Sequence, residues 1–497
     1  MPTLIISLSL LACSNGFFGR GEDPNITPMD TGDYEADADT DADADTDTDT
    51  DTDIDPDQTD DDGDGLSEDE GDCDDTDAEV SPDAEEVPYD GIDNDCDEDT
   101  VDDDLDGDGY DLDDDCDDED AEVSPEGTEV YGDDADNDCD GETDERFETE
   151  LADSCDCGSP SAIGVDSAGK AHIAYANNDD GHVWYKNVSA SGNWGTHKDI
   201  APFSLAGEWL DLAVDGADRV QVVYTWQGGG ARQVEFTWRD SGGTWDTYYV
   251  VDDRNTSGST NIGAFCSIDT DSNNLPSMAY YDDQGVYSWI TGNGTPVLAD
   301  YTSMGVDYAV YTMLDEHLLG DSGYYTDIAV DSSDYPNVAY TDWGADEVQF
   351  ASPMNGIFTE TVYGDPGYDV SLALQSDDTP CVAFQSANSA DLMYGCRVGN
   401  ENWDIETIDS SGSVGAGASL AFDSDDRPWI AYYNESSGNL KVAHDDGTGW
   451  ETWLVDGDDR DAGAYPSLAI GKDDTVHISY YDATNGQLMY ARSTDAR

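Results

Sequence analysis

The feature that most constrains this chain is a strand–turn–strand pattern that recurs seven times between residues 161 and 480. Each copy has an apolar strand, a polar turn and a second strand that ends in an aromatic residue. The copies are SAIGVDSAGKAHIAY (161–175), LDLAVDGADRVQVVY (210–224), FCSIDTDSNNLPSMAY (265–280), TDIAVDSSDYPNVAY (326–340), VSLALQSDDTPCVAF (370–384), ASLAFDSDDRPWIAY (418–432) and PSLAIGKDDTVHISY (466–480). Self-similarity of this kind indicates a repeat architecture.

Further strands follow each copy. Third strands include LKVAH (440–444) and LMYAR (488–492), and fourth strands include WDIETID (403–409) and WETWLVD (450–456). Four short strands per unit, separated by turn residues, are typical of β-propeller blades. We therefore predict an all-β fold with a seven-bladed β-propeller over residues 147–497. An open stack of repeats, or six blades, is the alternative.

The last repeat stops at Arg497, one strand short of a complete blade. The segment FETELAD (147–153) precedes the first repeat and matches WDIETID in length and pattern. Pairing this segment with the last repeat would leave no open sheet edge. We therefore predict that residues 147–153 close the ring.

Acidic residues divide the chain into two unlike parts. Residues 1–150 contain 63 Asp and Glu against two Arg, a charge of −61, and no Trp or His. That part cannot bury a core of ordinary size, whereas residues 151–497, with a charge of −41 and all 12 Trp, can. A net charge of −102 disfavours nucleic acid as a partner and favours cations. It also keeps copies apart, so we expect a monomer.

The N-terminal residues MPTLIISLSLLACSNG (1–16) contain a short apolar run, typical of a signal peptide and too short to span a bilayer. LLAC (10–13) resembles the bacterial lipobox. This resemblance implies a lipoprotein signal peptide at 1–12, lipidation at Cys13, and export to the bacterial outer membrane or cell surface on a lipid anchor. No basic residue precedes Leu4, so a plain secretory signal is the alternative.

Residues 13–59 follow, with DYEADADTDADADTDTDTDTDIDPD at 33–57. Nothing in that run can pack, and its like charges repel one another. We predict a disordered Asp/Thr-rich tether.

Residues 60–144 contain two copies of a second unit, in which Cys73 aligns with Cys116 and Cys96 with Cys139. Each copy has two clusters in which Asp alternates with other residues. The first clusters are Asp60, Asp62 and Asp64, and Asp104, Asp106 and Asp108; the second clusters are Asp93, Asp95 and Asp97, and Asp136, Asp138 and Asp140.

This alternation suits a hard cation. Calcium takes six to eight oxygen ligands, and carboxylates at positions 1, 3 and 5 of a tight loop can converge on one ion. A glycine at position 6 allows the turn, and position 7, here Leu66 or Tyr110, offers a backbone carbonyl. We predict Ca²⁺ sites at these clusters. The second cluster of copy one is the weakest, because Glu98 replaces the glycine.

Cysteine thiolates among carboxylates are electrostatically costly, so these cysteines should form disulfides in an exported chain. We predict the pairs Cys73–Cys96 and Cys116–Cys139, which staple the two clusters of each copy together. Cys381 and Cys396, on adjacent strands of one blade, form a third predicted pair. Three cysteines remain in the propeller region, so one of them is free or pairs unexpectedly. They are Cys155, Cys157 and Cys266.

The sequence DGDG…DCDD…SP…E…DGIDNDCD (62–97) resembles the metal-binding repeat of MopE-type surface proteins and, more loosely, thrombospondin type-3 calcium loops. The resemblance covers residues 60–144 and implies a metal-binding surface protein. MopE is associated with copper, but copper prefers imidazole or sulfur ligands, and the first histidine here is His172. The oxygen ligands favour Ca²⁺ over copper.

No Ser/His/Asp set, phosphate loop or zinc motif stands out in the propeller region. His172 and His477 occupy a repeat position that varies between copies, so we interpret both as structural. The Asp residues that end the first strands are interpreted as turn residues; they are Asp166, Asp215, Asp269, Asp331 and Asp423. We predict that the chain is not an enzyme and that its propeller binds a glycan or a protein.

Two alternatives from other classes are a sialidase-like glycan hydrolase and a copper-binding surface protein. The blades faintly resemble sialidase repeats. Such an enzyme needs clustered arginines, whereas Arg219 and Arg427 fall in equivalent turns of distant blades.

Overall fold

The structure is a computed structural model. It describes residues 59–84, 87, 92–96, scattered residues between 104 and 139, and residues 146–494 with gaps at 203–205, 229–230, 247, 253–261, 283–294, 301–309, 314–321, 353–357, 400–401 and 458–459. The predicted signal peptide, Cys13 and the tether lie outside the described residues. Contacts divide the chain into two units, residues 1–81 and residues 82–497.

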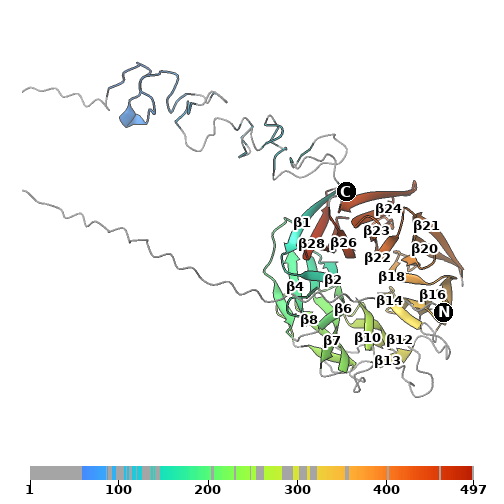
Figure 1. The fold of residues 1–497 in the computed structure, drawn as a ribbon. Helices are drawn as coiled ribbons and strands as arrows, with labels where there is room; N and C mark the ends of the chain where they lie inside the picture. The colour runs from blue at the N-terminus through green and yellow to red at the C-terminus, as the bar shows by residue number, and fades with distance from the viewer. Residues whose placement is uncertain are drawn as a thin grey trace, which may run out of the picture. The chain divides into compact units, whose positions relative to one another are not determined.

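The described part of residues 147–493 forms five four-stranded antiparallel sheets and one eight-stranded sheet, in which a parallel bridge between Asn439 and Ala462 joins two antiparallel four-stranded units (Figure 1). We call the seven four-stranded units blades 1 to 7. Blade 1 is β2 (Cys157–Val165), β3 (Ala171–Asn177), β4 (His182–Val188) and β5 (Lys198–Ala201). Blade 2 is β6 (Ala206–Val214), β7 (Val220–Gly228), β8 (Ala231–Arg239) and β9 (Tyr249–Asp252). Blade 3 is β10 (Ile262–Thr270), β11 (Pro276–Asp282), β12 (Thr295–Asp300) and β13 (Val310–Met313). Blade 4 is β14 (Ser322–Val330), β15 (Pro336–Asp342), β16 (Glu347–Ser352) and β17 (Phe358–Tyr363).

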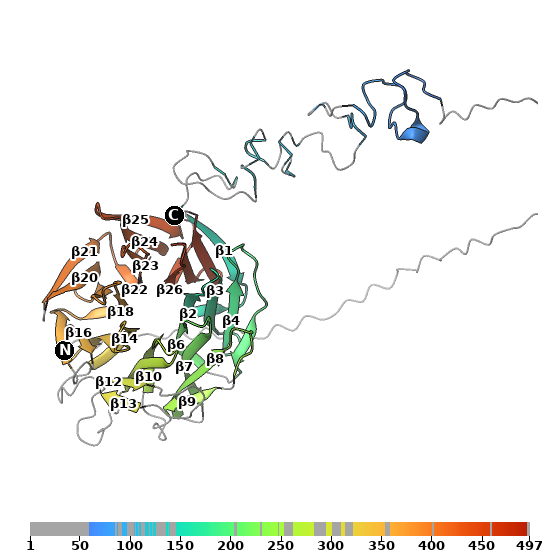
Figure 2. The same cartoon turned by 180° about the vertical axis from the view of Figure 1, so that it is seen from behind.

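The remaining blades include the closing strand. Blade 5 is β18 (Gly367–Leu374), β19 (Pro380–Ser386), β20 (Leu392–Gly399) and β21 (Asn402–Asp409). Blade 6 is β22 (Val414–Phe422), β23 (Pro428–Asn434), β24 (Asn439–Asp445) and β25 (Trp450–Asp456). Blade 7 is β26 (Ala462–Ile470), β27 (Val476–Asp482), β28 (Gln487–Ser493) and β1 (Phe147–Asp153). The blades surround a central axis, with the first strand of each repeat innermost, so the fold is the predicted all-β propeller (Figure 2).

Strand β1 lies beside β28, although the two are far apart in the sequence (Figure 1). The two strands pair antiparallel from Phe147 opposite Ser493 to Asp153 opposite Leu488. Phe147 is buried and packs edge-on against Trp429, with ring centroids 6.4 Å apart. The N-terminal strand thus occupies the outer position of blade 7 that the sequence pattern assigns to it.

One buried aromatic residue near the end of each second strand fills the space between blades. All seven have no exposed surface: Tyr175, Tyr224, Tyr280, Tyr340, Phe384, Tyr432 and Tyr480. Several of these tyrosines donate a hydrogen bond to the Asp that ends the fourth strand of the preceding blade, as Tyr280 does to Asp252 at 2.8 Å. Blade 1 ends in Ala201 instead, and there Tyr224 lies opposite Glu235 on the neighbouring strand of its own blade. The pattern explains why the sequence copies end in an aromatic residue.

Near the axis, short polar side chains connect the first strands of neighbouring blades at six of the seven junctions in the described propeller. Ser371 Oγ accepts the N–H of Leu420 at 3.1 Å, and Ser467 Oγ accepts the N–H of Ile163 at 3.2 Å, which links the last blade to the first. Asp327 Oδ2 accepts the N–H of Leu372 at 2.7 Å in the same manner. These bonds satisfy inner-strand amides that have no strand partner on the axis side.

A second set of interblade bonds joins the turns between first and second strands. In five blade pairs a turn Ser donates both its N–H and its Oγ–H to an Asp of the next blade, as Ser332 does to Asp378 at 2.8 and 2.6 Å. The other four pairs are Ser167–Asp218, Ser272–Asp334, Ser376–Asp426 and Ser424–Asp474. Each accepting Asp has a positive φ between 58° and 67°. We call these pairs the Ser–Asp latches.

The Asp residues that were predicted to close the turns do so, with one exception in blade 3. Asp166, for example, accepts the N–H groups of residues 168 and 170 through Oδ1, which closes the turn. In blade 3 this role belongs to Asp271, which accepts the N–H groups of Asn273 and Leu275, and not to Asp269. Asp269 instead accepts the N–H of Val330 in the next blade at 2.7 Å, and burial raises its pKa to about 6. Two Asp residues two positions apart had made the two roles indistinguishable in the sequence.

Candidate metal centre

The first acidic cluster of copy one folds as a tight loop. Asp60 Oδ1 accepts the N–H of Gly63 at 2.6 Å, and Asp64 Oδ1 accepts the N–H of Leu66 at 2.9 Å. Gly63 and Gly65 have φ values of +90° and +113°, in the region that favours glycine. The loop brings one carboxylate oxygen from each of Asp60, Asp62 and Asp64 within 4.8 Å of the others.

A second group of carboxylates adjoins this loop. A short 3-10 turn, η2 (Glu68–Glu70), ends at Gly71 with φ +105° and leads into the segment around Cys73. There Asp72 and Asp75 are 4% and 5% exposed, and together with Asp62 they form another group with oxygens within 4.8 Å. The N–H of Asp61 donates to Asp75 Oδ1 at 3.2 Å, so the loop and this segment contact each other.

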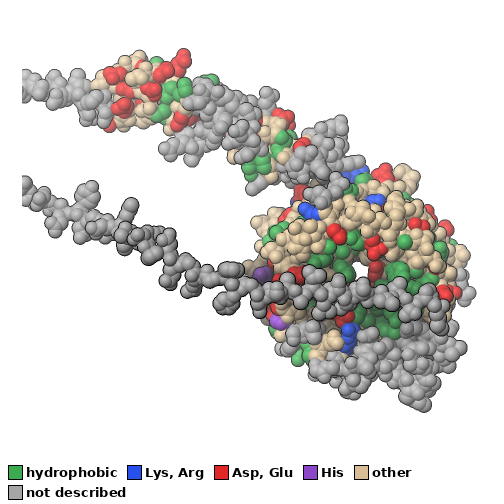
Figure 3. All heavy atoms as spheres, in the orientation of Figure 1, with side chains coloured by type: hydrophobic (Ala, Val, Ile, Leu, Met, Phe, Trp, Pro, Cys, Tyr) green, Lys and Arg blue, Asp and Glu red, His purple; other side chains and the backbone are tan. Residues whose placement is uncertain are grey.

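Charge in this segment is not balanced by the protein. No Lys, Arg or His lies between Arg20 and Arg146, and carboxylates gather on the surface of the segment drawn in blue in Figure 1 (Figure 3). Two like charges about 4 Å apart repel by roughly 1–4 kcal/mol near a protein surface. Burial raises the pKa of Asp62, and the hydrogen bond from the N–H of Asp64 lowers it. The neighbouring carboxylates of Asp64, Asp72 and Asp60 also raise this pKa, so that the net shift is upward.

Two of these side chains also carry an unused oxygen. Asp62 Oδ2 and Asp72 Oδ2 are buried and accept no hydrogen bond from the part of the chain that the structure describes. A buried carboxylate oxygen without a partner is costly unless a ligand satisfies it. A hard divalent cation therefore fits this donor set, which consists of oxygen alone.

Copy two repeats these features where it is described. Asp104 accepts the N–H groups of Gly107 and Gly109 at 2.7 and 3.0 Å, and both glycines have positive φ. Asp115 and Asp118, which align with Asp72 and Asp75, are 6% and 4% exposed. Asp115 Oδ2 is buried and, among the described residues, has no hydrogen-bond partner. The two copies therefore share one local structure as well as one sequence pattern.

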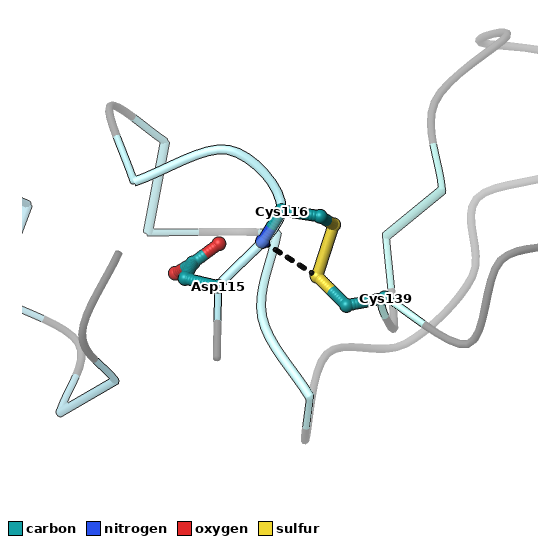
Figure 4. A group of neighbouring side chains, drawn as sticks. All are labelled: Asp115, Cys116 and Cys139. Atoms are coloured by element: carbon teal, nitrogen blue, oxygen red, sulfur yellow. Dashed lines mark hydrogen bonds between the residues drawn. A yellow bond between two sulfur atoms is a disulfide. The ribbon is translucent and has the colours of Figure 1, made fainter. Parts of the chain in front are cut away.

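Disulfides lie directly beside these carboxylates. Cys116 is bonded to Cys139, as predicted, and the N–H of Cys116 also donates to Cys139 Sγ at 3.1 Å (Figure 4). Cys73 and Cys96 are each disulfide-bonded as well. Asp115 lies against the bridge, but bonded sulfurs are not thiolates and do not act as soft-metal ligands. With no histidine in this part of the sequence, a copper site of imidazole and sulfur does not fit.

The other predicted ligands either form no such group among the described residues or lie outside them. Asp106, Asp136 and Tyr110 are described but belong to no converging group among the described residues, and the same holds for Asp93 and Asp95. Asp97, Asp108, Asp138 and Asp140 lie outside the described residues. The sequence did not single out Asp72, Asp75, Asp115 and Asp118, although both copies place an Asp directly before and two positions after the first cysteine.

The propeller carries a different candidate site. Half-buried aromatic residues from the first strands of blades 2 to 5 lie in a row, which we call the aromatic row: Trp209, Phe265, Tyr325 and Tyr368. Successive ring centroids are 5.4, 4.6 and 5.8 Å apart. The guanidinium of Arg232 lies 5.1 Å from the Trp209 ring and pairs with Glu208 at 2.6 Å. Its Nη1 is buried and unpaired within the described chain.

Two of the six histidines in the propeller region occupy structural positions. His172 and His477 are 1% and 3% exposed, and Nδ1 of each lies 2.6 Å from a tyrosine hydroxyl, of Tyr185 and Tyr490 respectively. Burial lowers the pKa of both to about 4. Each imidazole is therefore neutral at pH 7 and held in the interior of its blade.

The remaining cysteines are accounted for. Cys381 is bonded to Cys396 across neighbouring strands, as predicted. Cys155 is bonded to Cys157, which leaves Cys266 as the free and buried thiol among the described residues. Burial raises the pKa of Cys266, and the Asp211 carboxylate raises it further, so this thiol stays protonated.

Comparison with known proteins agrees with this division of the chain. Residues 72–107 and 115–145 match the Cu-binding MopE family, which is described as "Putative metal-binding motif". Both copies carry the motif. Among curated proteins, none matches the sequence.

Solved structures resemble the propeller at low identity. They include a Hadza microbial sialidase (11% identity, TM-score 0.43, covering 65% of this chain and 75% of that chain) and an ulvan lyase of family PL25 (11%, TM-score 0.47, 69% and 96%). The NanB sialidase from Streptococcus pneumoniae is another (12%, TM-score 0.38, 71% and 71%). These similarities concern the fold and carry no evidence of activity.

Proposed function

We propose that this chain is an exported surface protein whose acidic repeats bind Ca²⁺ and whose propeller binds a ligand. The observation that carries the metal assignment is the buried Asp72 carboxylate, which meets Asp62 and Asp75 with an oxygen that no described residue satisfies. The cation supplies positive charge that residues 21–145 lack altogether. Oxygen-only ligands and oxidised cysteines support calcium over copper.

Calcium binding should order the repeat segment. The loop carboxylates hold their own backbone through bonds such as Gly63 N–H to Asp60, but they repel one another until a cation binds. Hydrogen exchange of the full-length chain tests this directly. Amides of residues 61–75 should gain protection at about 1 mM Ca²⁺ relative to chelator, because extracellular calcium modules bind at about 0.1–1 mM. Equal exchange in the two conditions would refute calcium-dependent ordering.

The aromatic row supports binding by the propeller over hydrolysis. Aromatic side chains supply large contact areas at low entropic cost and are enriched in recognition surfaces. Hydrolysis of the sialidase kind would need grouped arginines, whereas Arg219 is paired with Asp215 at 2.7 Å and Arg427 lies 3.4 Å from Asp425, each within its own turn. We therefore propose a glycan or protein ligand for this face.

A glycan array with the full-length chain tests the ligand class. Binding that is lost in Trp209→Ala and retained in Trp450→Ala, on the outer strand of blade 6, would place the ligand at the aromatic row. Glycan binding that survives Trp209→Ala would place it elsewhere. Release of sugar product would overturn the assignment as a binding module.

We also propose that the chain is held at the bacterial outer membrane or cell surface by a lipid on Cys13. The support is the sequence LLAC and the run of acidic residues that separates it from the repeats. Among the described residues, no helix is both long and apolar enough to cross a membrane.

A further inference from the structure

The two carboxylate groups of copy one share a single residue. Asp60, Asp62 and Asp64 form one group, and Asp62, Asp72 and Asp75 form the other. We infer that copy one holds two neighbouring divalent cations that share the Asp62 carboxylate. The first is the cation of the D-x-D-x-D-G loop, and the second lies at Asp62, Asp72 and Asp75. This inference rests on the proposed calcium binding and assigns its ligands.

Burial supports a separate second position. Asp72 and Asp75 are almost fully buried, at 4% and 5% exposure, whereas Asp60 and Asp64 are exposed. Asp72 Oδ1 accepts the N–H of Asp74 at 3.0 Å, which fixes the side chain and leaves the buried Oδ2 with no described partner. An exposed carboxylate needs no ligand because water solvates it, but a buried oxygen does.

Asp62 can offer a carboxylate oxygen to each of the two cation positions. Asp62 Oδ1 accepts the N–H of Asp64 at 3.1 Å, and Asp62 Oδ2 is buried without a partner in the described chain. An oxygen that accepts one N–H retains a second lone pair, and carboxylates ligate calcium through one or both oxygens. The shared carboxylate can therefore serve both ions.

Charge favours two cations over one. The five carboxylates carry five negative charges, with no basic residue between Arg20 and Arg146. One divalent cation would leave three of these charges uncompensated, and two would leave one. Because like charges at these distances repel, the second cation removes most of the remaining repulsion.

Copy two repeats one feature of the second position, the buried carboxylate beside the first cysteine. Asp115 aligns with Asp72, is 6% exposed, and uses Oδ1 to accept the N–H of Asp117 at 2.9 Å, while its Oδ2 is buried and unpaired among the described residues. Asp72 Oδ2 and Asp115 Oδ2 thus have no described partner at the same position of both copies, so this feature is common to the two repeats. This position is distinct from the predicted site at Asp93, Asp95 and Asp97, which stays a prediction.

The test is a count of calcium ions bound per full-length chain, by equilibrium dialysis at saturating Ca²⁺. Asp62→Asn should lose two ions relative to the unmodified protein. The double variant Asp72→Asn/Asp75→Asn should lose one. Asp61→Asn is the matched control, because it makes the same charge change on an exposed side chain in the same loop and should lose none.

A second double variant completes the count. Asp60→Asn/Asp64→Asn should also lose one ion, and it should retain the ion that Asp72 and Asp75 hold. Resistance of the cysteines to alkylation without reductant, measured for each variant, shows that the disulfides are intact, so that a lost ion reports a lost ligand and not a lost fold.

Each other outcome decides a different question. If Asp72→Asn/Asp75→Asn keeps the full count while Asp60→Asn/Asp64→Asn loses an ion, the second position is refuted and calcium binding by the loop stands. If either double variant loses as many ions as Asp62→Asn, the two positions are not separate and the inference is wrong. If the unmodified chain binds no calcium, the proposed function itself fails.

Discussion

Replacement of Phe147 by Ala tests ring closure by the N-terminal strand. Phe147 is 6% exposed and packs in the cluster that includes Leu440, Ile478 and Met489. Truncation of a buried Phe to Ala costs about 3–5 kcal/mol. With an unfolding entropy of about 2.1 cal/mol/K per residue over about 350 residues, this corresponds to a fall in Tm of roughly 4–7 °C.

The strand supplies its own control. Leu151 lies on β1 as well but is 49% exposed, so Leu151→Ala should change stability by no more than about 0.5 kcal/mol. Calorimetry gives the Tm of each variant, and hydrogen exchange should show faster exchange in β28 for Phe147→Ala alone. Equal Tm values for the two variants, or unchanged protection in β28, would show that β1 does not hold blade 7 closed.

Three further predictions follow from the propeller and the N-terminus. Burial, and then the Asp327 carboxylate, raises the pKa of Asp211 from 3.8 to about 7. The contribution of the protonated Asp211 to stability is therefore full below pH 4 and is lost as the pH rises through 7. Asp211→Asn should flatten the decline of Tm between pH 4 and 7, and an unchanged pH profile would contradict this. Removing one latch by Ser332→Ala should cost about 0.5–1.5 kcal/mol, with no further cost in an Asp378→Ala background; full additivity in that double-mutant cycle would refute the latch. Cys13→Ser should release the protein from membranes, and mass spectrometry that finds an unmodified mature N-terminus would rule out the lipid anchor.

The fold could be predicted because its determinants are periodic. The aromatic residue that ends each second strand recurs in all seven copies, and each of the seven is fully buried between blades. The closing strand could be predicted because the last sequence repeat has three strand patterns, and residues 147–153 match the fourth strands of the other repeats in length and pattern. The latches could not be found in this way, since a bond from Ser332 to Asp378 joins turns 46 residues apart whose proximity follows only from the ring.

The metal site could be predicted in part. The loop ligands Asp60, Asp62 and Asp64 follow a local spacing that geometry alone explains. Asp72 and Asp75 lie near Asp62 because the chain turns at η2 and Gly71. No periodic pattern in the sequence predicts that turn. The prediction that Asp269 closes a turn was wrong, because Asp271 two positions later closes that turn while Asp269 is bonded to the next blade.

Calorimetric titration of the full-length chain with Ca²⁺ and, separately, with Cu²⁺ tests the central claim most directly. Oxygen-only ligands, oxidised cysteines and the absence of histidine before His172 predict saturable calcium binding at about 0.1–1 mM and weaker binding of copper. Absence of calcium saturation up to about 10 mM, or tighter binding of copper with spectral evidence of a nitrogen or sulfur ligand, would contradict the assignment.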